Sequence, residues 1–390
     1  MSFDFDKVND RRNTTSEKWN VKDNELPMWV ADMDFQTAPE ILEAMHKSLD
    51  GGIFGYQFVP DEYYQAVANW FKTEHNFEPK TEWMLFSTGV IPSISAIIRH
   101  LTDVGDNILL QEPNYNTFYG VIEHNGRNVT NSELIYENGT YSVDWQDLEE
   151  KLSDPQTTVM LVCNPHNPTG HIWSKETLTK IGELAKKHDV LIIADEIHGD
   201  ISMPGHSYVP FSSLDPEITK NSISLVSPTK TFNLAQLHAS TIIAPDENIR
   251  ARVERALSID DQIEPGILAV DGTIAAYTKG HEWLDGLKHY VSDNRQLLSD
   301  YVAKNIPELS VIKSDATYLA WIDCTKVTND SAELNDFIRQ ETGLYLAEGT
   351  KYRGNGNQFL RMNLATNKSR VQDGLERLER GVHQYLNLKK

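Results

Sequence analysis

The chain has 390 residues, of which 39% are hydrophobic, and this is enough apolar material for a large buried core. The length is typical of two domains, or of one large domain with an appendage. With 36 basic and 57 acidic side chains the formal net charge is −21, so the surface repels phosphate backbones and we expect no nucleic-acid partner.

Short runs that are apolar at every residue alternate with helical patterns between about residues 84 and 245. The runs are Ile108–Leu110, Val159–Val162, Val190–Ile193, Ile223–Val226 and Thr241–Ile243. Runs of this kind are typical of strands that are buried on both faces of a mostly parallel sheet. Residues 174–189 are predicted to form a helix, because Ser174 is a good N-cap and apolar residues recur on one face. These patterns predict an α/β fold.

The pattern changes near residue 286. A helix through Arg295 precedes two strand candidates, Tyr318–Ile322 and Phe359–Met362, and a final amphipathic helix begins near Val371. The glycine-rich string at 354–356 is expected to be a flexible loop. We therefore predict an N-terminal segment (1–48) that joins a small domain, a large domain (49–285) with a mostly parallel sheet flanked by helices, and a small α+β domain (286–390).

The N-terminal residues lack the apolar core of a signal peptide, and no apolar run approaches the ~20 residues of a membrane span. We therefore expect a cytoplasmic protein that has no membrane partner. The two cysteines, Cys163 and Cys324, have no C-x-x-C spacing and lie in apolar stretches. They indicate buried thiols rather than a disulfide, and no metal site is expected.

Polar clusters follow four predicted strands, the first of which is a further short apolar run at Met84–Phe86. They are Ser87-Thr88-Gly89-Val90, the string Asn164–Gly170, Asp195-Glu196-Ile197-His198, and Ser227-Pro228-Thr229-Lys230. Ligands of open α/β sheets gather at the carboxyl ends of the strands, so we expect the four clusters to meet at one edge. Each cluster alone is more often an ordinary turn, a strand end or a solvated charge. Their combination, with an anion cradle, an amide, a carboxylate and a lysine, indicates a functional site.

This combination matches the needs of pyridoxal 5′-phosphate (PLP). The phosphate of PLP binds backbone N–H groups at a helix N-terminus together with hydroxyl groups. Gly89, Val90 and Ser227 are predicted to supply these groups.

The ring and the aldehyde of PLP have requirements of their own. The pyridine nitrogen must stay protonated, and a buried carboxylate such as Asp195 keeps it so. The phenolic oxygen needs a hydrogen-bond donor, which we predict to be the amide of Asn167. The aldehyde needs a lysine as its covalent partner, and Lys230 is placed for this.

The motifs N-P-x-N-P-T-G, A-D-E-I-H and S-x-[ST]-K-T-F-N stand in this order along the chain. The order resembles fold-type I PLP-dependent enzymes of the class I/II aminotransferase superfamily. Within it, the string Leu26–Phe35 is similar to the signature of the MalY/PatB-type cystathionine β-lyase (C–S lyase) branch. Matches at Gly55-Tyr56, Glu112–Tyr115 and Phe359–Asn363 extend the resemblance to about residues 3–386.

The resemblance implies further roles. Tyr115 would stack on the pyridine ring, and Tyr56 would reach the phosphate of a neighbouring subunit, so that the active form would be a homodimer. Arg361 would bind the substrate α-carboxylate. His198 would lie beside the cofactor, where many aminotransferases have tyrosine, and it favours the lyase branch. The alternatives are core packing for the two tyrosines and a surface position for Arg361.

The resemblance also implies the reaction. We expect β-elimination from cysteine S-conjugates such as cystathionine or cystine, giving thiol, pyruvate and ammonia, with Lys230 taking the Cα proton. An aminotransferase with the same residues is an alternative, because only the 26–35 string and His198 separate the two. A regulatory protein that keeps the fold without turnover is an alternative of another class. The presence of Lys230, Asp195, Asn167 and Arg361 together argues against it.

Overall fold

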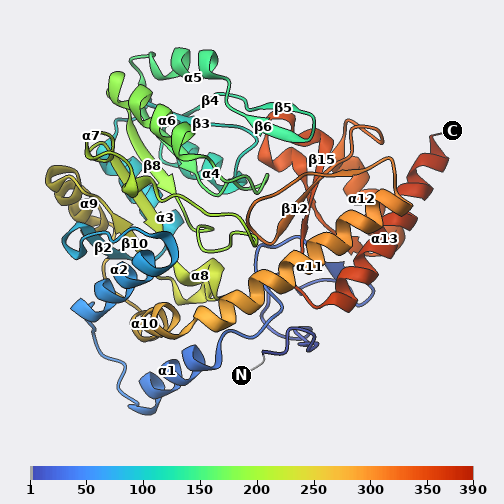
Figure 1. Cartoon of the computed structure of the whole chain (residues 1–390), viewed down its shortest axis with the longest axis horizontal. Helices are drawn as coiled ribbons and strands as arrows, with labels where there is room; N and C mark the ends of the chain where they lie inside the picture. Colours follow the sequence, from blue (N-terminus) through green and yellow to red (C-terminus); the bar gives the residue numbers. More distant parts are fainter. Residues whose placement is uncertain (1–2, 390) are drawn as a thin grey trace.

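The computed structural model describes residues 3–389, which form a large lobe and a small lobe connected by the long helix α11 (His281–Asn305) (Figure 1). Within these residues the sheet of the large lobe has the order β2 (Met84–Ser87), β10 (Ser240–Ile243), β9 (Ser222–Val226), β8 (Leu191–Asp195), β7 (Thr157–Cys163), β3 (Asn107–Leu110), β4 (Asn128–Asn131). The strands from β9 to β4 are parallel, and β10 is antiparallel to both its neighbours. The predicted strands and the mostly parallel sheet are confirmed.

Helices cover both faces of this sheet, which explains why its strands are apolar at every residue. Leu109 faces one layer and its neighbours Ile108 and Leu110 face the other, as the period of two in a strand requires. The layer on the Leu109 side contains α5 (Trp145–Leu152), α6 (Lys175–Lys187) and α7 (Pro216–Thr219). The opposite layer contains α3 (Val90–Leu101), α4 (Asn116–His124) and α9 (Glu247–Ile259). The β2 edge of the sheet packs against three further helices, α1 (Pro39–Asp50), α2 (Asp61–His75) and α10 (Ala269–Lys279).

Helix α6 confirms the helix that was predicted over residues 174–189. Its N-cap is Ser174, whose hydroxyl oxygen accepts the N–H of Thr177 at 3.1 Å. The remaining short elements of the large lobe are α8 (Pro228–Thr231), η1 (Thr81–Trp83), η2 (Phe211–Ser213), η3 (Ala235–Leu237) and the hairpin β5 (Ile135–Glu137) and β6 (Thr140–Ser142).

The small lobe has its own antiparallel sheet, covered by helices. The sheet has the order β11 (Ser310–Val311), β12 (Leu319–Asp323), β15 (Phe359–Asn363), β14 (Ala347–Glu348), and α12 (Ser331–Thr342) and α13 (Lys368–Leu388) pack with α11 around it. The apolar face predicted for the last helix is fully buried in this core.

The glycine-rich string at 354–356 is not the flexible loop that we expected. It lies in η5 (Gly354–Gln358), next to η4 (Gly349–Tyr352), and Gly356 is buried. A Cβ on Gly356 would lie 2.1 Å from the carbonyl oxygen of Gly349, so glycine is required for this close packing. The N–H of Gly354 donates to Glu112 of the large lobe at 3.1 Å.

The N-terminal segment contacts both lobes. Strand β1 (Leu26–Pro27) pairs with β13 (Leu344–Tyr345) of the small lobe, whereas α1 packs on α10 of the large lobe. Residues 28–35 therefore pass from one lobe to the other, and we call this stretch the strap. Among residues 3–389 no helix is both long and apolar enough to cross a membrane, and no group of three or more His, Cys, Asp or Glu is arranged to hold a metal ion.

Candidate active site

A cavity of about 250 Å³ lies at the carboxyl ends of β7, β8 and β9. Most residues that were predicted to hold the cofactor line it: Gly89, Val90, Tyr115, Asn167, Asp195, His198 and Lys230. Ala31, Tyr115 and Lys230 also line a larger cavity of about 1260 Å³, whose wall includes Arg361. The two cavities are therefore neighbouring compartments that share Lys230.

Lys230 lies on α8, directly after β9. Ser227 caps this short helix by accepting the N–H of Thr229 at 3.1 Å, which fixes where the lysine leaves the sheet edge. Enclosure by the protein lowers the pKa of Lys230 to about 8; the positive charge of Arg361 adds to the decrease, and Asp32 and Asp195 oppose it. Its Nζ donates to the carbonyl oxygen of Ala31 at 2.7 Å.

Asp195 ends β8 and is buried. Burial raises its pKa to about 6, although the N–H of Ile197, which donates to Oδ1 at 3.1 Å, and the charge of Lys230 oppose this shift. A carboxylate held this way favours a cationic partner at the cavity wall, because a nearby positive charge stabilises its ionised form.

The end of the cavity near α3 suits an anion. Gly89 is the N-cap of this helix, has a φ of 143° and makes no side-chain cap, so the first N–H groups of α3 are not satisfied by a capping side chain. Ser227 is placed differently from the prediction: its hydroxyl donates to the carbonyl oxygen of Ala239 at 2.7 Å. Thr229, whose hydroxyl lies 2.7 Å from that of Ser227, lines the cavity beside Lys230.

His198 is buried in the cavity wall, and its ring centroid lies 6.2 Å from that of Tyr318. Burial lowers its pKa to about 3, and the charges of Lys230 and Arg361 lower it further, so the ring is neutral near pH 7. Within residues 3–389 its Nδ1 has no hydrogen-bond partner. Tyr115, at the start of α4, packs edge-to-face on Phe118 with a centroid distance of 5.4 Å.

Arg361 is only 5% exposed, which rules out the surface position. It lies in the middle of β15, and its Nη1 donates to Oδ1 of Asn167 at 3.0 Å. Its Nη2 donates to the carbonyl oxygen of Trp29 at 3.0 Å, and the guanidinium lies over the ring of Tyr352 at 5.0 Å. Among the described residues Nε has no partner, so a donor remains for a ligand in the larger cavity.

Tyr56 lies apart from these residues. Its side chain is 97% exposed, and it lines neither cavity. Ile53, Phe54 and Phe58 beside it are exposed as well. One chain by itself therefore does not bring Tyr56 to the site.

In the sequence the strap stands out only as a signature, and its residue types predict no structural role. Its backbone forms one wall of the site, since the carbonyl of Trp29 accepts from Arg361 and that of Ala31 accepts from both Lys230 and Tyr318. The amide of Asn363 donates to the carbonyls on both sides of Ala31. These contacts involve main-chain oxygens, which every residue has, so the strap's residue types gave no signal of them.

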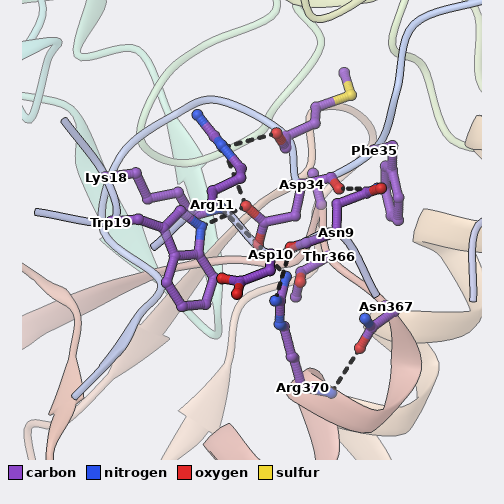
Figure 2. Close-up of polar contacts among 12 residues, drawn as sticks. Asn9, Asp10, Arg11, Lys18, Trp19, Asp34, Phe35, Thr366, Asn367 and Arg370 are labelled. Atoms are coloured by element: carbon purple, nitrogen blue, oxygen red, sulfur yellow. Dashed lines mark hydrogen bonds and ion pairs between the residues drawn. The ribbon is translucent and has the colours of Figure 1, made fainter. Parts of the chain in front are cut away.

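An ionic cluster holds the far end of the strap (Figure 2). The buried carboxylate of Asp34 accepts the indole N–H of Trp19 at 2.8 Å and lies 3.2 Å from Nζ of Lys18. Arg11 donates to Asp34 at 3.1 Å and to Asp32 at 2.6 Å. Despite its burial, Asp34 has a lowered pKa because these positive and hydrogen-bonding partners outweigh desolvation.

The donor set of the smaller cavity fits PLP. It provides a lysine whose pKa is about 8, a buried carboxyl group, an amide and an uncapped helix N-terminus, which match the aldehyde, the pyridine nitrogen, the phenolic oxygen and the phosphate. The unpartnered Nδ1 of His198 is a further buried polar atom in this wall.

The model of the class I and II aminotransferase family matches residues 25–378. The chain belongs to this family. Cystathionine β-lyase PatB of Bacillus subtilis (strain 168) is 39% identical over 383 residues, which cover 97% of this chain and 99% of that protein. Protein MalY of Escherichia coli (strain K12) is 32% identical over 381 residues, covering 96% of this chain and 97% of that protein.

One solved structure has nearly the same fold. Cystalysin from Treponema denticola, which contains a pyridoxal 5′-phosphate cofactor, superposes with a TM-score of 0.95 at 31% identity and covers 98% of this chain and 100% of that chain. This member of the class I and II aminotransferase family therefore has the fold-type I architecture, and it lies in the PatB/MalY branch that its sequence indicated.

Proposed function

We propose that the protein is a PLP-dependent carbon–sulfur lyase that cleaves cysteine S-conjugates of the cystathionine type into a thiol, pyruvate and ammonia. The observation that carries the proposal is the convergence of Lys230, Asp195 and Asn167 in one cavity, with Arg361 at its junction with the larger one. The similarity to PatB over nearly the whole chain supports the choice of lyase.

PLP, when bound, withdraws electrons from the substrate Cα and so makes its proton acidic. Lys230 is the proposed covalent partner and the base that takes this proton, and its pKa of about 8 suits a base working near neutral pH. Asp195 holds a proton on the pyridine nitrogen. Asn167, which Arg361 orients through its Oδ1, donates from its amide nitrogen to the phenolic oxygen.

The remaining residues bind and orient. The N–H groups at Gly89 and Val90 hold the phosphate, and the hydroxyl pair of Ser227 and Thr229 supports that end. Tyr115 stacks on the ring.

On the substrate side, Arg361 binds the α-carboxylate with the N–H groups that Trp29 and Asn167 leave free. His198 is neutral and borders the ring without adding a charge. A homodimer completes the phosphate site with Tyr56 of the partner subunit, and the exposed apolar side chains around Tyr56 support this part of the proposal. The cytoplasmic location expected from the sequence stays a prediction.

An assay with cystathionine tests the function. Purified protein with PLP, and without any added keto acid, should release pyruvate and homocysteine in equal amounts. Lys230→Ala should release neither and should fail to bind PLP covalently, since both the covalent partner and the base are lost. Turnover that required a keto-acid acceptor and produced a new amino acid would contradict the lyase and support the aminotransferase.

A further inference from the structure

The side-chain amine of Lys230 donates its hydrogen bond to a single acceptor, which is described below as its resting point. Within residues 3–389, the carbonyl oxygen of Ala31 is the only hydrogen-bond acceptor of its Nζ, at 2.7 Å. The same oxygen accepts the hydroxyl of Tyr318 at 3.0 Å. A carbonyl oxygen has two lone pairs, so the two donors occupy it fully.

The position of this oxygen is fixed by the strap and by Tyr318. Asn363 donates to the carbonyls of Val30 and Asp32 at 2.5 and 2.6 Å, which holds the backbone on both sides of Ala31. Among the described residues, Lys230 and Tyr318 are the donors to the Ala31 oxygen. Tyr318 is the immobile one, because its ring is completely buried in the core, whereas Lys230 is a flexible chain.

The other end of the strap, residues 33–35, is hydrogen-bonded to the turn that follows Lys230. The side-chain amide of Asn233, three residues after Lys230, donates to the carbonyl of Met33 at 3.0 Å and to that of Phe35 at 2.9 Å. Its Oδ1 accepts the N–H of Met33 at 3.0 Å. These bonds fix the strap relative to the turn that follows Lys230, and the Ala31 oxygen faces the amine of Lys230.

We infer that Tyr318 is a positioning residue for Lys230, acting through the carbonyl oxygen of Ala31 on which the lysine amine rests whenever it is not joined to the cofactor. The inference rests on the proposed function, in which the amine is freed when the substrate binds. The freed amine takes the Cα proton. With a fixed resting point it keeps that proton away from the cofactor, so the substrate loses its thiolate.

Without the Tyr318 hydroxyl the amine is less constrained and delivers its proton to the cofactor more often. In that case water supplies the oxygen of a keto acid, which leaves with its carbon–sulfur bond intact, and the substrate's amino group is left behind. The enzyme is then inactive until an added keto acid, such as pyruvate, takes the amino group back. Tyr318 thus favours elimination over amino transfer.

Tyr318→Phe removes the hydroxyl and keeps the ring. Tyr63→Phe is the matched control, because Tyr63 is equally buried and its hydroxyl bonds to Thr241 at 3.0 Å and to the carbonyl of Ser240 at 3.5 Å on β10 rather than to Ala31. In cofactor-free protein, the rate at which Lys230 captures PLP is followed by absorbance and by the mass of the hydride-reduced peptide. This rate should rise about fivefold to tenfold in Tyr318→Phe, because the loss of one hydrogen bond frees the amine to reach the cofactor more often, and it should stay native in Tyr63→Phe.

The loaded enzymes give a second readout. Tyr318→Phe should have a kcat lowered about tenfold, a KM within about twofold of native, and a loss of activity during turnover that pyruvate restores. Equal melting temperatures of the two variants would show that the effect is not general destabilisation. Native capture rate and native kcat in Tyr318→Phe would overturn the inference, as would equal changes in Tyr63→Phe. Failure of the native protein to capture PLP would instead overturn the proposed function.

Discussion

Asp195 and Glu196 are adjacent buried carboxyl groups at the end of β8, but they face different sides of the chain. Asp195 lines the smaller cavity, whereas Glu196 accepts the N–H of Phe211 at 2.7 Å on the other side of the chain. Burial raises the pKa of both, to about 6 for Asp195 and about 8 for Glu196. The sequence string alone does not tell which carboxyl faces the cavity, and the alternation of side chains at a strand end decides it.

The first residue-scale prediction compares these two groups. Asp195→Asn should still bind PLP but lose about 100-fold or more in kcat, because an amide does not hold the proton on the pyridine nitrogen. Glu196→Gln is the control, since it makes the same change one residue away and leaves the cavity wall intact, and its kcat should stay within about threefold of native. Steady-state kinetics with saturating PLP measure both. Near-native turnover of Asp195→Asn would mean that another carboxyl group has this role.

Glu196 also gives a prediction for stability. Because burial raises its pKa to about 8, the folded state keeps a proton that the unfolded state loses near pH 4.5. Between these values the folded state binds more protons, so the free energy of unfolding decreases as the pH rises, by up to about 1.4 kcal/mol per pH unit. Urea unfolding of cofactor-free protein at pH 5, 6.5 and 8 should show a smaller decrease for Glu196→Gln than for native protein. Equal decreases would contradict the assignment.

At the scale of elements, the turn at Gly170 connects the lobes. Its carbonyl oxygen accepts the N–H groups of Asp315 and Ala316 at 2.9 and 3.0 Å, so the loop before β12 docks on the turn after β7. Gly170 has a φ of +71°, and a Cβ there would lie 1.8 Å from Oγ of Ser314. The glycine therefore serves both the turn and the close approach of the small lobe.

Two glycine substitutions separate these effects. Gly139 has a similar φ of +77° in the β5–β6 turn but nothing within 4 Å of a Cβ. Gly139→Ala should cost about 1–2 kcal/mol from backbone strain alone. Gly170→Ala should cost about 1–3 kcal/mol more, because the docked loop must move. Thermal or urea unfolding measures both, and equal losses would show that the contact with Ser314 adds nothing.

The fold could be predicted from the sequence further than the site could. Strands buried on both faces leave unbroken apolar runs, and Ser174 marks a helix start, so β7, β8, β9 and α6 were predicted. Lys230 and Asp195, which were singled out because they follow or end buried strands, both line the smaller cavity. Ala31 was missed because its contact is a carbonyl oxygen, and Tyr318 because a buried tyrosine gives the same signal whether its hydroxyl serves the core or the site. The hydroxyl of Ser227 was assigned to the phosphate, but a bond to Ala239 engages it.

At the scale of the whole molecule, one surface is incomplete in the single chain. Ile53, Phe54, Tyr56 and Phe58 project from the stretch between α1 and α2 and are 68–97% exposed. Such a run of large apolar side chains is typical of a surface that another chain covers. The proposed homodimer would bury it.

Sedimentation tests this assembly. Native protein should sediment as a dimer, and Phe58→Asp should shift it towards monomer and lose activity, because a buried unpaired charge opposes association. Val8→Asp is the control, since Val8 is 60% exposed and lies outside this stretch, and it should remain a dimer. Tyr56→Phe should keep the dimer but bind PLP more weakly. A fully active monomer, or unchanged PLP affinity in Tyr56→Phe, would contradict the proposed interface.

The strap also has a consequence for synthesis of the chain on the ribosome. Val30 and Asn363, which hydrogen-bond across the lobes, are 333 residues apart. At ~5–20 residues per second, the ribosome needs roughly 20–70 seconds to make the strand that receives the strap. The strap is therefore made long before the strand that holds it, so one wall of the site stays incomplete until β15 has been made. A truncated product that lacks β15 should therefore be inactive even if its large lobe has folded.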